Sequence, residues 1–431
     1  MGERRDERTA GPGRAATLPV PDAALVRLRR RTLALLAGGQ VLGGFGIGAA
    51  ASVGALAASD LAGEAWSGVA AVMSTLGAAV VALPLARLAD RRGRRVSLSG
   101  AALTAAAGAV LCTVALGQAS AVLLFVGLAL LGVATAGSLQ ARFAATDLAS
   151  PLSRGRDLSL VVWSTTLGAV VGPNLAAPGD VVGGAFGLPP LAGVFLFPVL
   201  TQLLAATAYL VGLRPDPLLE SRRRARIALD ADPGRAPRPD DPGDPRLVRA
   251  AIATVALSHA TMVALMAMTP VHLVHGGATL SVVGFTLSLH IAGMFALSPF
   301  FGVLVDRWGA VRTVVLGQGL LASAAVVTGL ASDSHAAVVV GLVLLGLGWS
   351  ASTVAGAALL TAAAPAATRI RVQGRSDLAM NLAGTFGGAV AGPVLAVLGY
   401  AGLAWLLLVP VAAVLLANGQ AARRPRLLPV R

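Results

Sequence analysis

Methionine and histidine are the side chains in this sequence whose types and spacing are best suited to chemistry. The chain has 7 methionines and 5 histidines, and four of each lie between residues 259 and 294. Within that stretch, "MVALM" places Met262 and Met266 four residues apart, and "HIAGM" does the same for His290 and Met294. On an α-helix, residues at this spacing share one face. Thioether sulfur and imidazole nitrogen suit Cu(I), whereas Mg²⁺ and Ca²⁺ prefer oxygen, so the pattern predicts a copper site.

Three further histidines in this region are secondary metal candidates. His259 lies three residues before Met262 and could extend the same face inward. His272 and His275 lie toward the outer end, where they could capture a metal ion at an entrance. The alternative interpretation is that the methionines fill gaps in a packed core, that a histidine inside the membrane is a hydrogen-bonded structural group, and that His275 is only a loop residue beside two glycines.

The elements that must position these side chains are apolar helices. Hydrophobic residues make up 56% of the chain and charged residues only 13%, and the mean hydropathy is +0.77. The apolar runs are about 20 residues long, enough to cross a hydrocarbon core of about 30 Å as helices. The alternating polarity of a membrane β-barrel is absent. The composition therefore predicts an all-α membrane protein.

Breaking the apolar runs at charged and Gly/Pro-rich clusters predicts twelve transmembrane helices. Their expected ranges are 32–57, 66–86, 96–117, 121–141, 158–178, 189–212, 250–273, 280–303, 313–330, 336–362, 378–398 and 400–417.

The arginines predict the orientation of these helices. All 34 basic residues are arginines, and they fall into alternate gaps between the predicted spans. By the positive-inside rule both termini are cytoplasmic, in a multi-pass protein of the cell membrane. The formal net charge of +14 is then a topology signal, so the lipid bilayer is the expected partner and nucleic acid is not.

A polar segment divides the spans into two groups of six. Residues 214–247 are rich in Pro, Asp and Arg and cannot bury a core, so they are expected to form a cytoplasmic linker. We therefore expect a cytoplasmic tail over 1–31, a six-helix bundle over 32–213, the linker, a second six-helix bundle over 248–417, and a second tail over 418–431.

The predicted spans also bring the methionine and histidine pairs to matching depths. Counting along each helix from its arginine-marked boundary places Met262 level with Met294, and Met266 level with His290. These depths are about 18–26 Å from the cytoplasmic boundary, near the middle of the bilayer. The four side chains are therefore expected to converge on one site.

Two short repeats relate the halves. "LADRRG" at 88–93 matches "LVDRWG" at 304–309, and "GAVVGP" at 168–173 matches "GAVAGP" at 388–393. Both pairs run in the same direction and occupy equivalent places in the two groups of spans. Such collinear matches are what a duplicated six-helix unit leaves behind.

With these features the chain resembles the major facilitator superfamily over essentially all of its spans. The turn "ARLADRRGRR" looks like the signature of that family between spans 2 and 3. The resemblance implies two six-helix bundles in the major facilitator fold, transport by alternating access, and a role for this turn in stabilising one conformation. The alternative is that its arginines only fix topology. The gating candidates in the two copies are Asp90, Arg91, Gly93, Arg94, Asp306, Arg307 and Gly309.

A narrower resemblance concerns the substrate. "MVALM" and "HIAGM" resemble the MxxxM and HxxxM motifs of CcoA-like copper importers of this superfamily. The resemblance implies that Met262, Met266, His290 and Met294 bind metal and that the protein imports copper. Copper would be the transported substrate, with no resident cofactor, and we expect a monomer.

Other functions remain open at this stage. One is a transporter or exporter of a small organic solute such as a drug or vitamin, and another is a membrane sensor that binds copper without transporting it. Spans 1, 7 and 8 carry no Asp, Glu or Arg at mid-depth, which argues against a fixed countercharge for a large charged substrate. No nucleophile and base pair is evident, and Cys112 lies alone in an apolar run, so an enzyme is not expected.

One last pair of charges lies at the end of span 4, in "QARFAATDLA". Arg142 and Asp147 could pair or couple to a conformational change. The alternative is that both are solvated or extend to the membrane boundary, as most charges in such places do.

Overall fold

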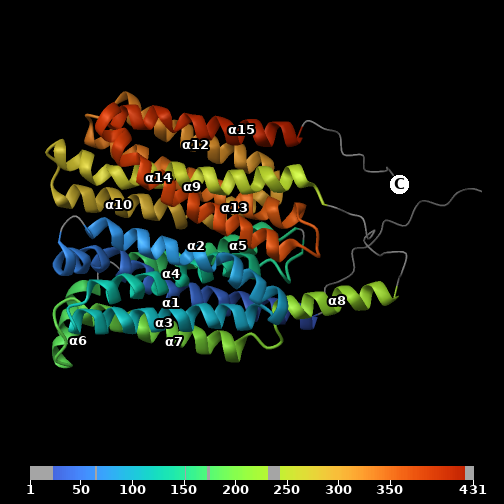
Figure 1. Ribbon diagram of the computed structural model, residues 1–431. Coiled ribbons are helices and arrows are strands. Elements are labelled where there is room, and N and C mark those ends of the chain that lie inside the picture. The colour runs from blue at the N-terminus through green and yellow to red at the C-terminus, as the bar shows by residue number, and fades with distance from the viewer. Residues whose placement is uncertain (1–22, 64–65, 151, 172–174, 232–242, 423–431) are drawn as a thin grey trace, which may run out of the picture.

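The computed structural model describes residues 23–63, 66–150, 152–171, 175–231 and 243–422, and these form a bundle of long, nearly parallel helices (Figure 1). The first half contains α1 (Ala23–Ala62), α2 (Ser67–Arg92), α3 (Arg94–Gly117), α4 (Ala121–Ala144), α5 (Arg154–Val171), α6 (Ala176–Ala185), the short helix η3 (Ala192–Phe195) and α7 (Leu196–Gly212). The second half follows α8 (Pro217–Ala231) and contains α9 (Pro245–His275), α10 (Leu280–Phe295), α11 (Ser298–Trp308), α12 (Ala310–Leu330), α13 (His335–Ala363), α14 (Arg369–Leu406) and α15 (Leu408–Ala422).

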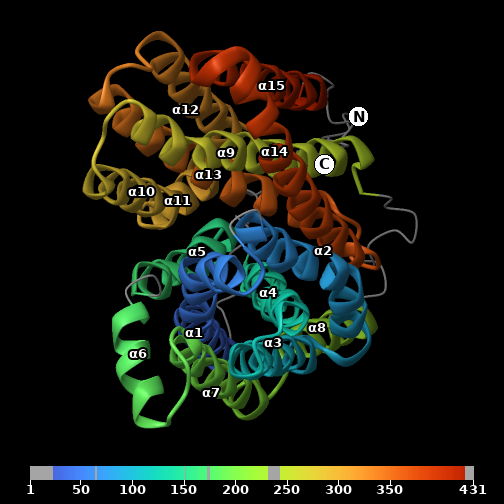
Figure 2. The ribbon, with the colours of Figure 1, turned by 60° about the vertical axis from the view of Figure 1, so that its left-hand side comes forward.

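Helices α1 to α7 pack on one another as the N-half, and α9 to α15 pack on one another as the C-half (Figure 2). Glycine allows several of these helices to approach closely. A Cβ at Gly132 of α4 would meet the backbone of Ser74 in α2, and one at Gly108 of α3 would meet the backbone of α4. Because lipid provides no hydrophobic driving force between membrane helices, their association depends on close van der Waals packing, which small residues at the contact allow.

The prediction of an all-α membrane protein is confirmed. No strand occurs in the described part of the chain, and nine helical segments there are long and apolar enough to cross a membrane. Predicted span 8 is divided between α10 and α11, and predicted span 5 runs into residues 172–174, which lie outside the described ranges. Predicted spans 11 and 12 are separated at Gly399, whose non-helical backbone, with φ of 68°, breaks the helical segment Arg369–Leu406. Glycine takes this left-handed conformation at little cost.

Helix α8 lies inside the segment expected to be an unstructured linker. The Asp216 carboxylate accepts hydrogen bonds from the backbone N–H groups of Leu218 and Leu219, at 3.0 and 3.2 Å, and so caps the helix. Glu220 in the first turn pairs with Arg223 and Arg224. Hydrogen bonds from Arg223 and Arg224 lower the pKa of Glu220 to about 2. Local capping and ion pairs thus form a helix that has no apolar core of its own.

The predicted tails are shorter than expected from the sequence. Helix α1 already begins at Ala23, inside the predicted tail 1–31, and α15 continues to Ala422, inside the predicted tail 418–431. Residues 1–22 and 423–431 lie outside the described ranges. The apolar-window criterion ended each span where charge or polarity began, although a helix can continue beyond the apolar core.

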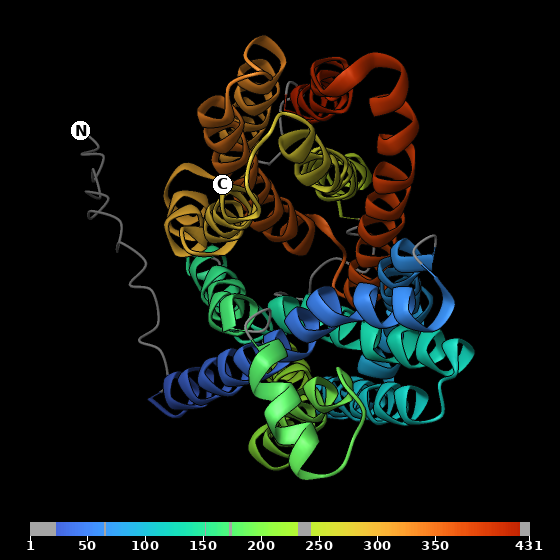
Figure 3. The same cartoon turned by 90° about the vertical axis from the view of Figure 1, so that its left-hand side faces the viewer.

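The two halves meet along two seams. Helix α2 packs against α14, and α5 packs against α10 and α11; Figure 3 shows the two groups of helices from one end. In the first seam, a Cβ at Gly374 would collide with Ala86. In the second, a Cβ at Gly302 would lie 2.6 Å from the carbonyl oxygen of Gly155 and closer still to the hydroxyl of Ser159. Both seams therefore depend on a glycine at the point of closest approach.

Candidate functional site

A cavity of about 190 Å³ lies between the two halves. The N-half contributes lining residues from α1, α4 and α5, and the C-half contributes others from α9, α10, α13 and α14. Its lining residues are Gln40, Thr135, Ser138, Leu139, Arg142, Val162, Thr165, His259, Met294, Phe295, Trp349, Thr353, Met380 and Asn381. Because both halves form its walls, any movement of one half against the other changes the cavity.

Gln40 is the polar group that α1 presents to this cavity. It is buried, and its side-chain amide nitrogen donates hydrogen bonds to the hydroxyls of Ser138, at 2.9 Å, and Thr165, at 3.2 Å. These two bonds use both of its N–H groups. The carbonyl oxygen of Gln40 is therefore the part left to accept a hydrogen bond from a solute.

His259 and Trp349 form the polar and aromatic wall on the opposite side. The indole Nε1–H of Trp349 donates to Nδ1 of His259 at 3.0 Å. An indole N–H can only donate, so Nδ1 is the acceptor and the neutral imidazole carries its proton on Nε2. Phe295 packs edge-on against Trp349, with ring centroids 5.6 Å apart. Trp349 therefore fixes both the tautomer and the orientation of the histidine.

An ion pair between the halves lies at one end of the cavity. Arg142 of α4 donates to the Asp377 carboxylate of α14 at 2.7 Å, and both side chains are 2% exposed. The Arg142 Nε and the second carboxylate oxygen, Oδ2, are buried without a hydrogen-bond partner. A buried pair of this kind is costly to break, because removing one partner leaves the other as an uncompensated charge.

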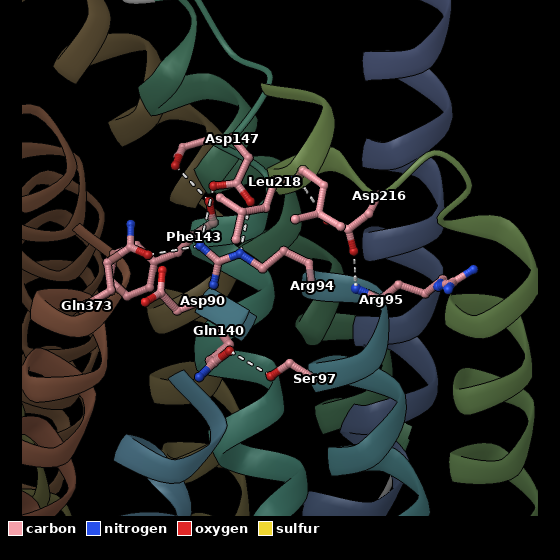
Figure 4. A network of polar contacts seen from close by, with 12 residues as sticks. Asp90, Arg94, Arg95, Ser97, Gln140, Phe143, Asp147, Asp216, Leu218 and Gln373 are labelled. Carbon is pink, nitrogen blue, oxygen red and sulfur yellow. Dashed lines mark hydrogen bonds and ion pairs between the residues drawn. The ribbon is translucent and has the colours of Figure 1, made fainter. Parts of the chain in front are cut away.

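Further from the cavity, a second polar network joins the halves at the end of the bundle that carries the α2–α3 turn at Gly93 and helix α8. We call this the linker end. Arg94 donates to the Asp147 carboxylate at 2.9 and 3.3 Å and to the side-chain oxygen of Gln373 at 2.9 Å (Figure 4). Arg94 and Asp147 belong to the N-half and Gln373 to the C-half. Arg94 therefore ties the α2–α3 turn to α14.

The second copy of the repeated turn makes a different contact between the halves. The Asp306 carboxylate of α11 accepts hydrogen bonds from the backbone N–H groups of Gly155, at 2.8 Å, and Arg156, at 2.9 Å. These are the first free N–H groups of α5, where a helix dipole stabilises negative charge. A carboxylate of the C-half thus caps a helix of the N-half.

Asp90, the counterpart of Asp306 in the first copy, is bound by the linker helix instead. Arg222 of α8 donates to its carboxylate and to its backbone carbonyl oxygen, the latter at 2.7 Å. Beside it, Asp216 accepts from the backbone N–H of Arg95 at 2.7 Å (Figure 4). The two copies of the repeat therefore differ: the Asp306 carboxylate bonds across the interface between the halves, whereas the Asp90 carboxylate bonds to α8.

The remaining gating candidates have structural positions that follow from the turn itself. Gly93 and Gly309 have φ of 87° and 91°, a conformation that favours glycine. Arg91 and Arg307 are exposed. The conformation at both turns accounts for the glycine of the repeated "DRxG" pattern, and a gating role for Arg91 and Arg307 stays a prediction.

The four predicted metal ligands have different surroundings in the structure. Met294 lines the cavity, and Met262 is buried in the same apolar cluster of the C-half, against which Met266 packs. The Nδ1 of His290 bonds with the backbone carbonyl of Leu342 in α13 at 2.7 Å, and its Nε2 is buried without a partner. Within the described ranges, no three His, Cys, Asp or Glu side chains are grouped to hold a metal ion.

The secondary candidates also divide. His259 lines the cavity, whereas His272 and His275 lie near the opposite end of α9. His272 bonds with the carbonyl of Ser332 at 2.8 Å and stacks on Tyr400, with ring centroids 4.1 Å apart. Tyr400 follows the bend at Gly399, so His272 connects α9 to that bend. His275 is exposed.

Arg142 and Asp147 do not pair with each other, as they could have done from their positions in the sequence. Arg142 pairs with Asp377, and Asp147 pairs with Arg94. Arg142 lies in the last turn of α4 and points to the C-half, while Asp147 lies in the following turn of chain. Because the two residues lie in successive turns of the chain, each forms an ion pair with a different partner.

Sequence reasoning missed Asp377, Trp349 and Gln373. Asp377 lies one residue before the predicted start of span 11 and therefore looked like a boundary charge. Its proximity to an arginine 235 positions away becomes visible only when the halves are assembled.

Comparisons with a family model and with related proteins point to the same family. A model of the Major Facilitator Superfamily matches residues 36–279 and 250–426. The uncharacterised MFS-type transporter YddS of Bacillus subtilis is 38% identical over 89% of this chain and 91% of its own length. The riboflavin transporter RfnT of Brucella anthropi is 28% identical over 90% of this chain and 94% of its own length.

The fold is similar to that of solved transporters. The human organic anion transporter MFSD10 (TETRAN) superposes with a TM-score of 0.73, over 90% of this chain and 99% of that chain, at 17% sequence identity. At this identity the likeness shows the fold alone. The predicted major facilitator fold is thereby confirmed.

Proposed function

This chain belongs to the Major Facilitator Superfamily of membrane transporters, and on that premise we propose that it works by alternating access, with its substrate in the cavity between the halves. The observation that carries the proposal is the combination of this cavity with the contacts at one end of it. Among the described residues, the hydrogen bonds between the halves lie toward the linker end: Arg94 to Gln373, Arg142 to Asp377, Ser298 to Ser159, and Asp306 to α5. Hydrogen bonds between the halves at one end of the cavity are what would stabilise a transporter conformation that is closed at that end.

We further propose that the linker end faces the cytoplasm of a cell-membrane protein with both termini inside. The clustering of arginines at this end supports it by the positive-inside rule. In this orientation the conformation is closed toward the cytoplasm, and substrate transport requires the contacts between the halves to break. We also propose a monomeric carrier rather than an enzyme, since residues of one chain form both walls of the cavity.

We propose a small organic solute as the substrate class. The cavity offers Gln40, His259 and Asn381 as hydrogen-bonding groups and aromatic and thioether side chains as apolar contacts. Sites for organic ligands have this composition, mostly apolar with a few placed polar groups. The relative RfnT, which transports riboflavin, supports the same class at 28% identity.

Copper import is the second candidate. The observation in its favour is the Nε2 of His290, which is buried without a partner one helical turn from the cavity-lining Met294. An imidazole nitrogen and a thioether at this spacing suit Cu(I). The likeness of these motifs to CcoA-like importers remains its other support.

Cysteine accessibility tests alternating access without requiring the substrate to be known. In a Cys112→Ala background, Thr135→Cys places a thiol in the cavity, and a charged, membrane-impermeant thiol reagent is applied from either side of oriented vesicles. We expect reaction from both sides. The matched control, Val126→Cys on the exposed, apolar face of α4, should react from neither. Reaction at Thr135→Cys from one side only, under every condition, would contradict the proposal.

Uptake by proteoliposomes separates the substrate classes. If copper is the substrate, Cu(I) accumulates with the unmodified protein, and both His290→Ala and Met294→Ala reduce it. Copper accumulation no greater than in protein-free liposomes would eliminate copper as the substrate, and equal accumulation by the unmodified protein and both variants would show that His290 and Met294 do not bind it.

A further inference from the structure

The charges and hydrogen-bonding groups of the cavity lining limit which organic solutes it can bind. The inference drawn from them rests on the proposed transport function. We infer that the cavity selects an uncharged, ring-containing solute that carries hydrogen-bond donors and acceptors on its edge. Three independent properties of the lining support it: its balance of charge, its free polar groups and its apolar walls.

The charge of the lining is balanced within the protein. Arg142 is the ionic side chain among the described lining residues, and the Asp377 carboxylate neutralises it at 2.7 Å. His259 accepts a hydrogen bond from Trp349 on Nδ1 and is therefore neutral. An anion or a cation entering this cavity would have no unpaired countercharge, and a buried charge without one is strongly disfavoured.

The free polar groups are of both kinds. Gln40 has committed both N–H groups to Ser138 and Thr165, which leaves its carbonyl oxygen as an acceptor. The side-chain amide of Asn381 donates through one N–H to the backbone carbonyl of Asp377 at 2.8 Å, which leaves its other N–H as a donor and its own carbonyl oxygen as a second acceptor.

The donors come from the C-half. Nε2–H of His259 follows from the hydrogen bond that Trp349 makes to the other ring nitrogen. Thr353 lines the same cavity, and its hydroxyl is buried without a hydrogen-bond partner, so it can donate to a solute once a side-chain rotation exposes it. A solute that satisfies the whole set must itself offer both donors and acceptors, since a polar group left unpaired on binding costs affinity.

The apolar walls favour a ring. Trp349 and Phe295 form an edge-on aromatic pair, and the thioethers of Met294 and Met380 also line the cavity. Aromatic faces and methionine sulfur both make favourable contacts with a flat aromatic system. A compact, strongly hydrated solute would leave these walls without contacts.

Two flavins provide a matched test. Riboflavin is uncharged and has a planar ring with donors and acceptors on its edge, whereas riboflavin 5′-phosphate has the same ring with an added phosphate. Purified protein in proteoliposomes is loaded with unlabelled flavin, and exchange of the labelled flavin is measured. We expect exchange of riboflavin. Riboflavin 5′-phosphate should exchange at least about tenfold more slowly, because an energetic cost of about 1.4 kcal/mol for burying its uncompensated phosphate charge already produces that difference.

Substitutions of lining residues test which side chains of the cavity bind the flavin. We expect Gln40→Leu and His259→Ala each to raise the riboflavin KM about tenfold, which is the effect of one lost hydrogen bond to a buried group. Gln118→Leu is the matched control, because Gln118 follows α3 at the far end of the N-half and does not line the cavity. It should leave the exchange unchanged.

The outcomes separate this inference from the proposed function. Equal exchange of the two flavins, or no binding of riboflavin as detected by flavin fluorescence, would overturn the substrate class. So would riboflavin exchange that is insensitive to both Gln40→Leu and His259→Ala. The accessibility of Thr135→Cys from both sides would still stand in each of these cases, and its failure would overturn the transport function itself.

Discussion

The Arg142–Asp377 pair is the residue-scale feature on which the closed conformation most depends. It joins the halves inside the protein, where each charge is compensated by the other. Two of its atoms, Arg142 Nε and Asp377 Oδ2, lack partners. The pair is therefore less completely hydrogen-bonded than a purely structural ion pair would be, which is consistent with a contact that must break during transport.

Single and double substitutions test this pair. Arg142→Gln and Asp377→Asn should each destabilise the protein by about 3–5 kcal/mol, because each leaves one uncompensated buried charge. The double substitution removes both charges and should cost clearly less than the sum. The free energy of unfolding in detergent, from denaturant titrations, measures the coupling. Additive effects would show that the two side chains do not interact in the folded protein.

The same residues show what the sequence could and could not predict about the site. The spacing in "MVALM" and "HIAGM" drew attention to a cluster in which Met294 does line the cavity, and His259 was a secondary candidate. Helical periodicity relates residues within one helix, but it does not say which face turns toward a partner helix. His290 illustrates the limit, since its Nδ1 bonds to α13.

At the scale of elements, the two seams between the halves depend on glycine. The packing of α5 against α11 brings Gly155 and Gly302 into backbone contact, so no side chain fits between the helices. A transporter whose halves separate at this seam needs a contact that is tight when closed and has no interlocked side chains when open. Gly374 in the other seam has the same role against Ala86.

Gly302→Leu should shift the conformational equilibrium toward opening at the linker end. The closed seam would have to widen, at a cost of about 1–3 kcal/mol, which corresponds to a change in the equilibrium of about 5-fold to 150-fold. The faster reaction of Thr135→Cys from the linker end would report it. Gly319→Leu is the control, because Gly319 is exposed on α12 and its Cβ would meet nothing within 4 Å. Equal reaction rates in the two variants would show that this seam does not control access.

Helix α8 should depend on Arg222 for its attachment. Arg222 is 42% exposed in its ion pair with Asp90, so the pair contributes about 0–1 kcal/mol. Arg222→Ala should therefore raise the hydrogen-exchange rate of α8 about threefold, while Arg226→Ala, at an exposed position one turn further along, should not. A similar increase in both variants would indicate general loss of helix charge rather than loss of the contact with Asp90.

The first turn of α8 should be insensitive to mild acid. The pKa of Glu220 is lowered to about 2 from a usual value of 4.5, so its ion pairs contribute stability above pH 4.5, and that contribution is lost as the pH falls through about 2. Hydrogen exchange in α8, corrected for its intrinsic pH dependence, should be constant from pH 8 to 5. A marked loss of protection near pH 6 would contradict the assignment of these pairs.

The elements themselves were largely predictable. Apolar length predicted where most of the long helices lie, and the polar segment 214–247 predicted their division into two groups. Helix α8 was missed because its stability comes from the Asp216 cap and the pairs of Glu220, which composition does not reveal. The boundary between predicted spans 11 and 12 falls at Gly399, where the backbone of the structure is non-helical.

At the scale of the whole molecule, two duplicated halves enclose one cavity and close it at one end with unequal contacts. Asp306 caps α5 across the interface, while its counterpart Asp90 is held by α8. The duplication was visible in the repeated turns, but this asymmetry was not, because it depends on a linker helix that has no counterpart in the repeat. The halves can therefore be expected to separate at the linker end by movement about the cavity.

The distance between the halves at the linker end tests this account most directly. Spin labels on Arg156→Cys in the N-half and Arg371→Cys in the C-half, in a Cys112→Ala background, both occupy exposed positions. Pulsed electron paramagnetic resonance in lipid nanodiscs should give two populations of the distance between the labels. The shorter distance belongs to the closed conformation, and the fraction of molecules with the longer distance should increase in the Gly302→Leu variant. A single short distance, unchanged by Gly302→Leu and by every solute tested, would contradict alternating access through this interface.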